Sequence, residues 1–182
     1  MELLLIIGVF EAFSLGLLLF LKKKRNASDS ILASFFLLFG INILLSYIEL
    51  YNRKNGYPFP AFINTTAPFI LMHGPILWFY IQSQTKQKFQ FKPIYLLHFI
   101  PFIGILIDHA SQLYFLPVEE KIHIVTTEAF KDYFTYPLWV MVITISPLVY
   151  FSWGIRILNT YNSKIENFLS HTELFDFRWL KK

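Results

Sequence analysis

The stretch that decides the fold is LLLIIGVFEAFSLGLLLFL at residues 3–21, which is followed directly by KKKR at residues 22–25. About 20 apolar residues are enough to cross the hydrocarbon core of a bilayer as a helix. A secretory signal peptide carries its positive charges before the apolar segment, whereas this chain begins Met1-Glu2 and places them after it. We therefore expect a retained membrane helix whose C-terminal end lies inside the cell.

The composition extends this pattern to the whole chain. Hydrophobic residues make up 55% of the 182 residues and charged residues only 15%, whereas soluble domains carry about 25% charged residues. A soluble helical protein is disfavoured because the apolar residues form long blocks that leave no polar helix face. We predict an all-α, polytopic transmembrane helical bundle of about five spans within residues 1–158. The spans are expected at residues 3–21, 31–50, 62–83, 94–108 and 137–158.

The placement of the basic residues predicts the orientation of the bundle. If the spans alternate from an outer N-terminus, 12 of the 16 Lys and Arg residues lie inside and four lie outside. Positive residues accumulate in cytoplasmic loops, so we expect the N-terminus outside and the C-terminus inside. Residues 159–182 then form a cytoplasmic tail or the start of a further helix, because Ser170 and Glu173 have the spacing of a capping box.

The long connection at residues 109–136 is predicted to lie outside. Pro117 can begin a helix, and Glu119 and Glu120 would lie in its first turn, where negative charge is favourable. Apolar residues then recur at helical spacing as far as Tyr133. We expect an amphipathic helix over residues 117–133 that lies on the membrane surface, and a loop of mixed structure stays open as the alternative.

Three prolines fall inside the expected spans: Pro75, Pro101 and Pro147. A proline inside a helix removes one backbone hydrogen bond and clashes with the preceding turn. We therefore expect helix kinks at all three positions.

Polar residues within the apolar spans are the candidates for function. Counting along the spans places Glu11, Asn42 and His73 at similar depth, near the middle of the membrane. Ionisable groups at that depth are costly and face a partner or a cavity. We expect Glu11 and His73 to pair, with Asn42 within reach. The three could form a ligand pocket or a proton-sensitive switch, or only interhelical hydrogen bonds that hold the bundle together.

Little in the sequence indicates an enzyme. The chain has no cysteine, and its five histidines include no pair at i,i+4 on one helix, so we expect neither a metal nor a cofactor. No phosphate-binding glycine loop or nucleophile motif is present. The net charge of +4 is small and scattered, so we expect no nucleic acid to be bound by this segment.

Four short stretches carry a family resemblance: LMHGPILWFYIQS at 71–83, KPIYLLHFIPF at 92–102, IIGVFE at 6–11 and FRWL at 177–180. Together they resemble the membrane-embedded N-terminal sensor region of Bacteroidetes-type regulators with an AraC-type helix-turn-helix output, some relatives carrying a histidine kinase instead. The resemblance implies a location in the bacterial cytoplasmic membrane. It also implies about two further spans and a DNA-binding domain after Lys182, so this chain would be a truncated or split member or a fragment.

The functional hypothesis that follows is a non-enzymatic sensory or input module that couples an unknown signal to a cytoplasmic output. The lipid bilayer is its expected partner, and the sequence leaves open a homodimer and an unidentified small-molecule ligand. The alternative is a small transporter or channel subunit that uses the region of Glu11 and His73 as a pathway.

Overall fold

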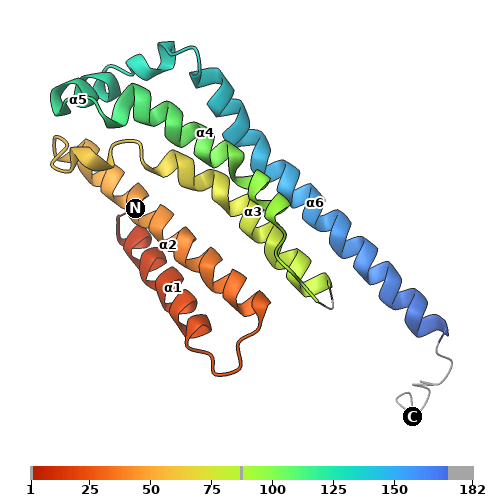
Figure 1. Ribbon diagram of the computed structural model, residues 1–182. Helices are drawn as coiled ribbons and strands as arrows, with labels where there is room; N and C mark the ends of the chain where they lie inside the picture. Colours follow the sequence, from red (N-terminus) through yellow and green to blue (C-terminus); the bar gives the residue numbers. More distant parts are fainter. Residues whose placement is uncertain (1, 87, 172–182) are drawn as a thin grey trace.

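A computed structural model describes residues 2–86 and 88–171, and all regular secondary structure in these ranges is helical (Figure 1). Successive long helices run up and down, so that each is antiparallel to the next one along the chain. The elements in chain order are α1 (Glu2–Phe20), α2 (Ala27–Lys54), η1 (Pro60–Phe62), α3 (Thr66–Thr85), η2 (Pro93–Phe99), α4 (Ile100–His109), η3 (Ala110–Tyr114), α5 (Val118–Thr126), η4 (Ala129–Asp132) and α6 (Tyr136–His171).

Polar contacts at both ends hold α1 and α2 together as a hairpin. At the connection, Asn26 and Asp29 form a capping box, in which the Asp29 backbone N–H donates to Asn26 Oδ1 at 2.7 Å. Such a box satisfies two backbone donors that a helix start leaves free. Lys22 pairs with the Asp29 carboxylate at 2.8 Å, and at the opposite end Lys54 pairs with Glu2 at 2.6 Å. These contacts fix the register of the two helices.

Four helical segments are long and apolar enough to cross a membrane: α1, α2, the run 93–114 and the part of α6 at 136–165. The expected third span, α3, is a 20-residue helix but is not among these four. It packs against α2, α4 and α6, and it buries Leu71, Trp78 and Phe79 at 2–5% exposure. Because neighbouring helices cover α3, its covered side chains can be more polar than side chains that face lipid.

Gly74 allows α3 and α6 to pack closely. A Cβ atom at this position would overlap the ring of Tyr150 on α6. The ring is held in place, since the Tyr150 hydroxyl lies 2.7 Å from Nδ1 of His98. Trp78 and Trp153 stack against the same histidine, with ring centroids 4.7 and 5.7 Å away. This aromatic cluster joins α3, η2 and α6.

We expect Gly74→Ala to lower the thermal stability of the purified protein, because overpacking a well-filled interface costs about 1–3 kcal/mol. The matched control is Gly8→Ala on α1, where the added Cβ would lie 3.4 Å from Ile43, an ordinary contact distance. The melting temperatures of the two variants in one detergent provide the comparison. Equal melting temperatures would mean that α3 and α6 do not approach closely at Gly74.

The helices expected as the fourth and fifth spans extend beyond the boundaries predicted for them. Helical structure runs from residue 93 to residue 114 rather than from 94 to 108, and Pro101 lies in the first turn of α4. Pro101 thus lies where η2 joins α4, and the kink expected there stays a prediction. Pro75 and Pro147 do lie inside helices, in α3 and α6.

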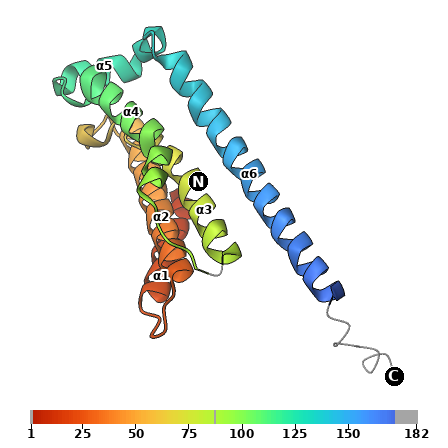
Figure 2. The same cartoon turned by 45° about the vertical axis from the view of Figure 1, so that its right-hand side comes forward.

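The last helix, α6, is continuous for 36 residues. The expected break after residue 158 is absent, and the described part of the predicted tail continues α6 as far as His171. The proposed cap at Ser170 therefore falls in the last turn of α6, while its partner Glu173 lies outside the described residues. In Figure 2, α6 stands apart from the other long helices toward its lower end and reaches beyond them.

The connection that leads to α6 folds back over the upper end of the bundle (Figure 1). The predicted surface helix is present only as α5, which is shorter than residues 117–133, and η4 follows it after a turn at Glu128 with φ of 57°. Ile124 of α5 is buried against Ile63 and Leu113. The apolar side of α5 thus covers neighbouring protein, in addition to any surface it offers to lipid.

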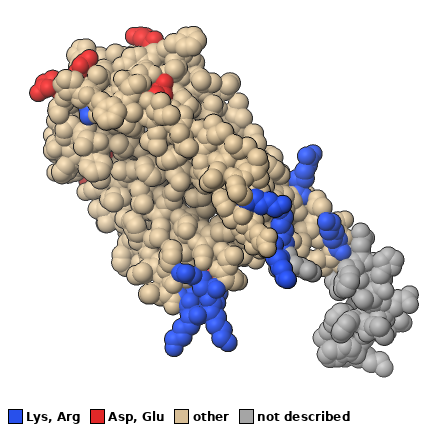
Figure 3. Space-filling view, viewed as in Figure 1, with Lys and Arg blue, Asp and Glu red and all other residues tan. Residues whose placement is uncertain are grey.

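Charged residues separate toward the two ends of the molecule. Figure 3 shows most of the visible Lys and Arg at the lower end and most of the visible Asp and Glu around the top. The lower set comes from the α1–α2 connection at residues 22–25, the α3–η2 connection and the inner part of α6. The apolar surface between the ends includes exposed Leu18, Ile103 and Leu148, as expected where a helix faces lipid.

Candidate functional site

The structure does not bring Glu11, Asn42 and His73 together. Glu11 is exposed on α1, which packs against α2. The His73 ring packs edge-on against Phe35 and Phe39, and its Nε2 atom is buried without a partner among the described residues. The predicted pairing of Glu11 with His73 is therefore absent, because α2 occupies the side of α3 on which α1 was expected.

Asn42 makes a different interhelical contact. Its side chain is 8% exposed, and Nδ2 donates to the backbone oxygen of Thr66 at 3.1 Å. The Thr66 hydroxyl in turn donates to Glu49 at 2.8 Å. These two bonds tie α2 to the first turn of α3, which is a structural role of the kind that polar residues have between membrane helices.

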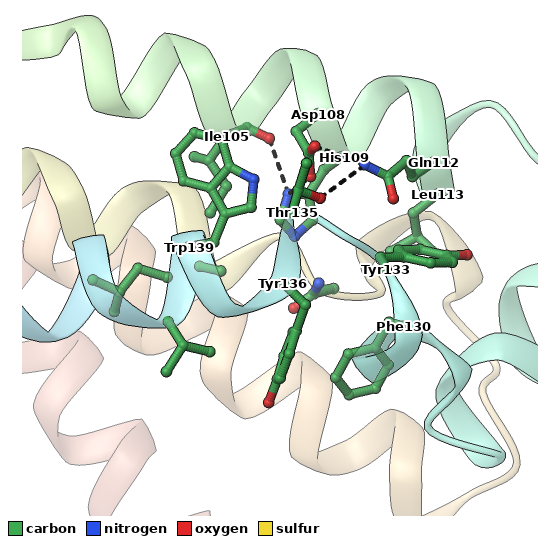
Figure 4. A pocket seen from close by; sticks show the side chains of 14 residues that line it. Ile105, Asp108, His109, Gln112, Leu113, Phe130, Tyr133, Thr135, Tyr136 and Trp139 are labelled. Carbon is green, nitrogen blue, oxygen red and sulfur yellow. Dashed lines mark hydrogen bonds and ion pairs between the residues drawn. The ribbon is translucent and has the colours of Figure 1, made fainter.

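A partly enclosed cavity of about 130 Å³ lies at the upper end of the bundle. It is formed by α4, η3, η4 and the first turns of α6, together with the start of α3. Figure 4 shows side chains from these elements converging on the cavity, with the aromatic rings of Phe130, Tyr133 and Tyr136 along one side. One wall is η3, a single π-helical turn. Such turns are rare and are frequently found at functional sites.

A polar network links the two sides of this cavity. Gln112 Nε2 donates to Asp108 Oδ1 at 2.6 Å and to Thr135 Oγ1 at 3.1 Å. Asp108 and Gln112 belong to α4 and η3, whereas Thr135 directly precedes α6. The network therefore couples the start of α6 to the end of the fourth span.

Two further groups give the cavity hydrogen-bonding capacity. His109 Nδ1 lies 2.9 Å from the Ile105 backbone oxygen and 4.0 Å from Asp108 Oδ2. The first distance favours the tautomer that carries its proton on Nδ1, which leaves Nε2 as an acceptor. Trp139 Nε1 is buried and has no acceptor within the described part of the chain. A small, mainly apolar molecule with one acceptor atom would satisfy this indole.

The turn that carries the lining residue Phe130 also holds an ion pair between Lys131 and Glu128. The hydrogen bond to Glu128 raises the pKa of Lys131 above its ordinary value. Lys131 therefore stays protonated across the physiological pH range, and the pair contributes little to stability because it is exposed. Within the described residues, no group of three His, Cys, Asp or Glu side chains is placed to hold a metal ion.

Sequence reasoning misses this cavity because it ends the fourth helix at residue 108 and places residues 117–133 on the membrane surface. The feature of the sequence that could reveal the cavity is the i,i+4 spacing of Asp108 and Gln112. These residues share a helix face only if the fourth helix continues past residue 108. The contribution of Thr135 and Trp139 could not be found in this way, since they lie about 25 residues further along the chain.

Comparison with known proteins gives no relative: no family model, no curated protein and no solved structure matches this chain.

Proposed function

We propose that this chain is a membrane-embedded sensory or input module, in which a small molecule in the upper cavity changes the position of α6. The observation that carries the proposal is the continuity of α6. Tyr136, Trp139 and Ile143 in its first turns line the cavity, and the same helix continues without interruption to His171 at the opposite end. A change in packing at the cavity therefore has a direct structural route to the other side of the bundle.

The chemistry of the cavity limits the ligand class. Its aromatic rings favour an apolar molecule, and the free Trp139 N–H favours one with an acceptor oxygen or nitrogen. Such a ligand shifts the position of α6 only by the difference in its affinity for the two arrangements. The Gln112–Thr135 contact is the part of the cavity wall that would change most, because it joins two elements.

The proposal includes five spans, with the N-terminus outside and the C-terminus inside. The gathering of basic residues at the lower end supports this orientation (Figure 3). The resemblance to sensor regions of AraC-type regulators supports a bacterial cytoplasmic membrane and a cytoplasmic output joined after α6. The transporter alternative has less support, because Glu11 is exposed on α1 while the His73 ring packs against Phe35 and Phe39 of α2.

Filling the cavity tests the proposal without a known ligand. The chain has no cysteine, so Lys24→Cys and Asn162→Cys provide unique sites for spin labels at the lower ends of α1 and α6. We expect Ala67→Phe, which places a ring in the cavity, to shift the distance between the labels by about 2 Å or more. Pulsed electron paramagnetic resonance measures this distance in lipid nanodiscs.

The matched control is Leu148→Phe, which adds a ring to α6 on an exposed surface that does not line the cavity. We expect the control to leave the distance unchanged. An unchanged distance in Ala67→Phe, with the protein still folded, would contradict the coupling of the cavity to the lower end of α6.

A further inference from the structure

A basic hollow of about 310 Å³ opens between the lower ends of α3 and α6, where the two helices stand apart in Figure 2. Its wall carries Lys86 from the end of α3 and Arg156 and Lys164 from α6, and none of its lining residues is acidic. All three cations are exposed, and the ion pairs between described residues include none of them. The hollow therefore concentrates positive charge and attracts an anion.

A buried acceptor faces the same hollow. Gln82 lines it with a side chain only 8% exposed, and its Oε1 atom has no hydrogen-bond partner in the described part of the chain. The neighbouring hydroxyls cannot supply a donor, because Thr85 and Thr160 each donate at 2.9 Å to a backbone oxygen of their own helix. A buried acceptor without a partner is costly. A ligand that carries a donor beside its negative charge would relieve this cost.

An apolar groove of about 270 Å³ adjoins the hollow along α6. Its lining is almost entirely apolar and includes Met141, Ile145 and Val149. The groove and the basic hollow share Trp153. The hollow offers a positively charged site at the lower ends of α3 and α6. The apolar groove runs from this site toward the middle of α6.

We propose that the hollow and the groove form one binding site for an anionic phospholipid whose headgroup carries a hydroxyl, as in phosphatidylglycerol. The phosphate lies between Lys86, Arg156 and Lys164, and the headgroup hydroxyl donates to Gln82 Oε1. One acyl chain follows the groove past Trp153. A free phosphate would match the basic hollow alone, whereas a lipid also accounts for the adjoining groove. Basic pockets between membrane helices bind such headgroups.

This site requires only that the chain is embedded in a bilayer, and it is independent of a signalling role. The lipid would bridge α3 and α6 at the end where they separate. Its presence would therefore favour one spacing of the two helices over others.

The test is lipid binding to the full chain in detergent, measured by native mass spectrometry with equal amounts of phosphatidylglycerol and phosphatidylcholine. We expect one phosphatidylglycerol to be retained per chain. Replacing both Arg156 and Lys164 by Gln should weaken this binding by about tenfold or more. The matched control is Lys23→Gln with Lys24→Gln, which removes the same charge from the α1–α2 connection and should bind like the unmodified chain.

Lys86→Gln provides a second, milder variant if the double substitution impairs folding, which circular dichroism will report. Gln82→Leu should reduce the preference for phosphatidylglycerol over phosphatidylmethanol, an anionic lipid without a headgroup hydroxyl. Equal retention of phosphatidylcholine, or an equal loss in the control, would overturn the site. Displacement of the lipid by millimolar glycerol 3-phosphate would show a free-phosphate site in its place, and an unchanged preference in Gln82→Leu would overturn the role of that residue.

Discussion

A reporter enzyme that is active only in the cytoplasm will be active when fused after Lys182 and silent when fused after Val118. The physical reason is that loops rich in Lys and Arg remain on the cytoplasmic side during insertion. Residues 22–25 place four basic residues directly after the first helix, where they have the largest influence on orientation. The expected difference in activity is all-or-none, because each fusion point lies on one side or the other.

Fusions after Arg25, Asn55 and Lys88 extend the test to the helix whose crossing is least evident from composition. If α3 crosses the membrane, the reporter is active after Arg25 and Lys88 and silent after Asn55. If α3 does not cross, the fusion after Lys88 is silent, and four spans place both termini on one side. Immunoblots of the fusion proteins control for differences in expression. Silence after Arg25 together with activity after Asn55 would reverse the orientation, whatever the number of spans.

Leu148→Arg should prevent α6 from crossing the membrane in most chains. Leu148 lies in the middle of the apolar part of α6 and is 63% exposed. An exposed leucine in water tolerates arginine within about 0.5 kcal/mol, whereas arginine at the centre of a membrane helix costs about 3 kcal/mol. That cost lowers the equilibrium for insertion by roughly 100-fold. The reporter fused after Lys182 measures the effect directly, since its activity depends on α6 reaching the cytoplasm.

The matched control for this substitution is Phe134→Arg. Phe134 is 96% exposed and lies in the connection between η4 and α6, outside the apolar helices. It should leave reporter activity close to that of the unmodified chain. Equal activity in the two variants would indicate that the exposed face of α6 meets water, and the assignment of α6 as a membrane span would then be wrong.

The helices could be predicted from the sequence because each apolar block is local and has clear ends. The block at 3–21 matches α1 to within one residue at each end, and the block at 31–50 lies within α2. Depth along a helix also follows from residue counting at about 1.5 Å per residue. Counting residues does not show which helices pack against each other. Glu11 and His73 were placed at one depth, but α2 lies between their helices, so equal depth gave no contact.

The cavity was beyond sequence reasoning for a related reason. Its polar network joins Gln112 to Thr135, and no local pattern states that these residues meet. The π-helical turn η3 also changes the side of the helix on which Gln112 and Leu113 lie. The same limit applies to the aromatic cluster at His98, where the family resemblance marked the histidine but not its partner Tyr150.

The length of α6 gives it a mechanical advantage. Pro147 divides the helix unequally, with arms of roughly 16 Å toward Tyr136 and roughly 36 Å toward His171. A proline removes one backbone hydrogen bond and makes this the most easily bent point of the rod. The nearby bond between Tyr150 and His98 holds the rod against the bundle beside that point, as a fulcrum does. If α6 tilts as one rigid body about this contact, as the proposed function requires, a displacement of about 1 Å at the cavity becomes a swing of about 2 Å at the far end of the lever.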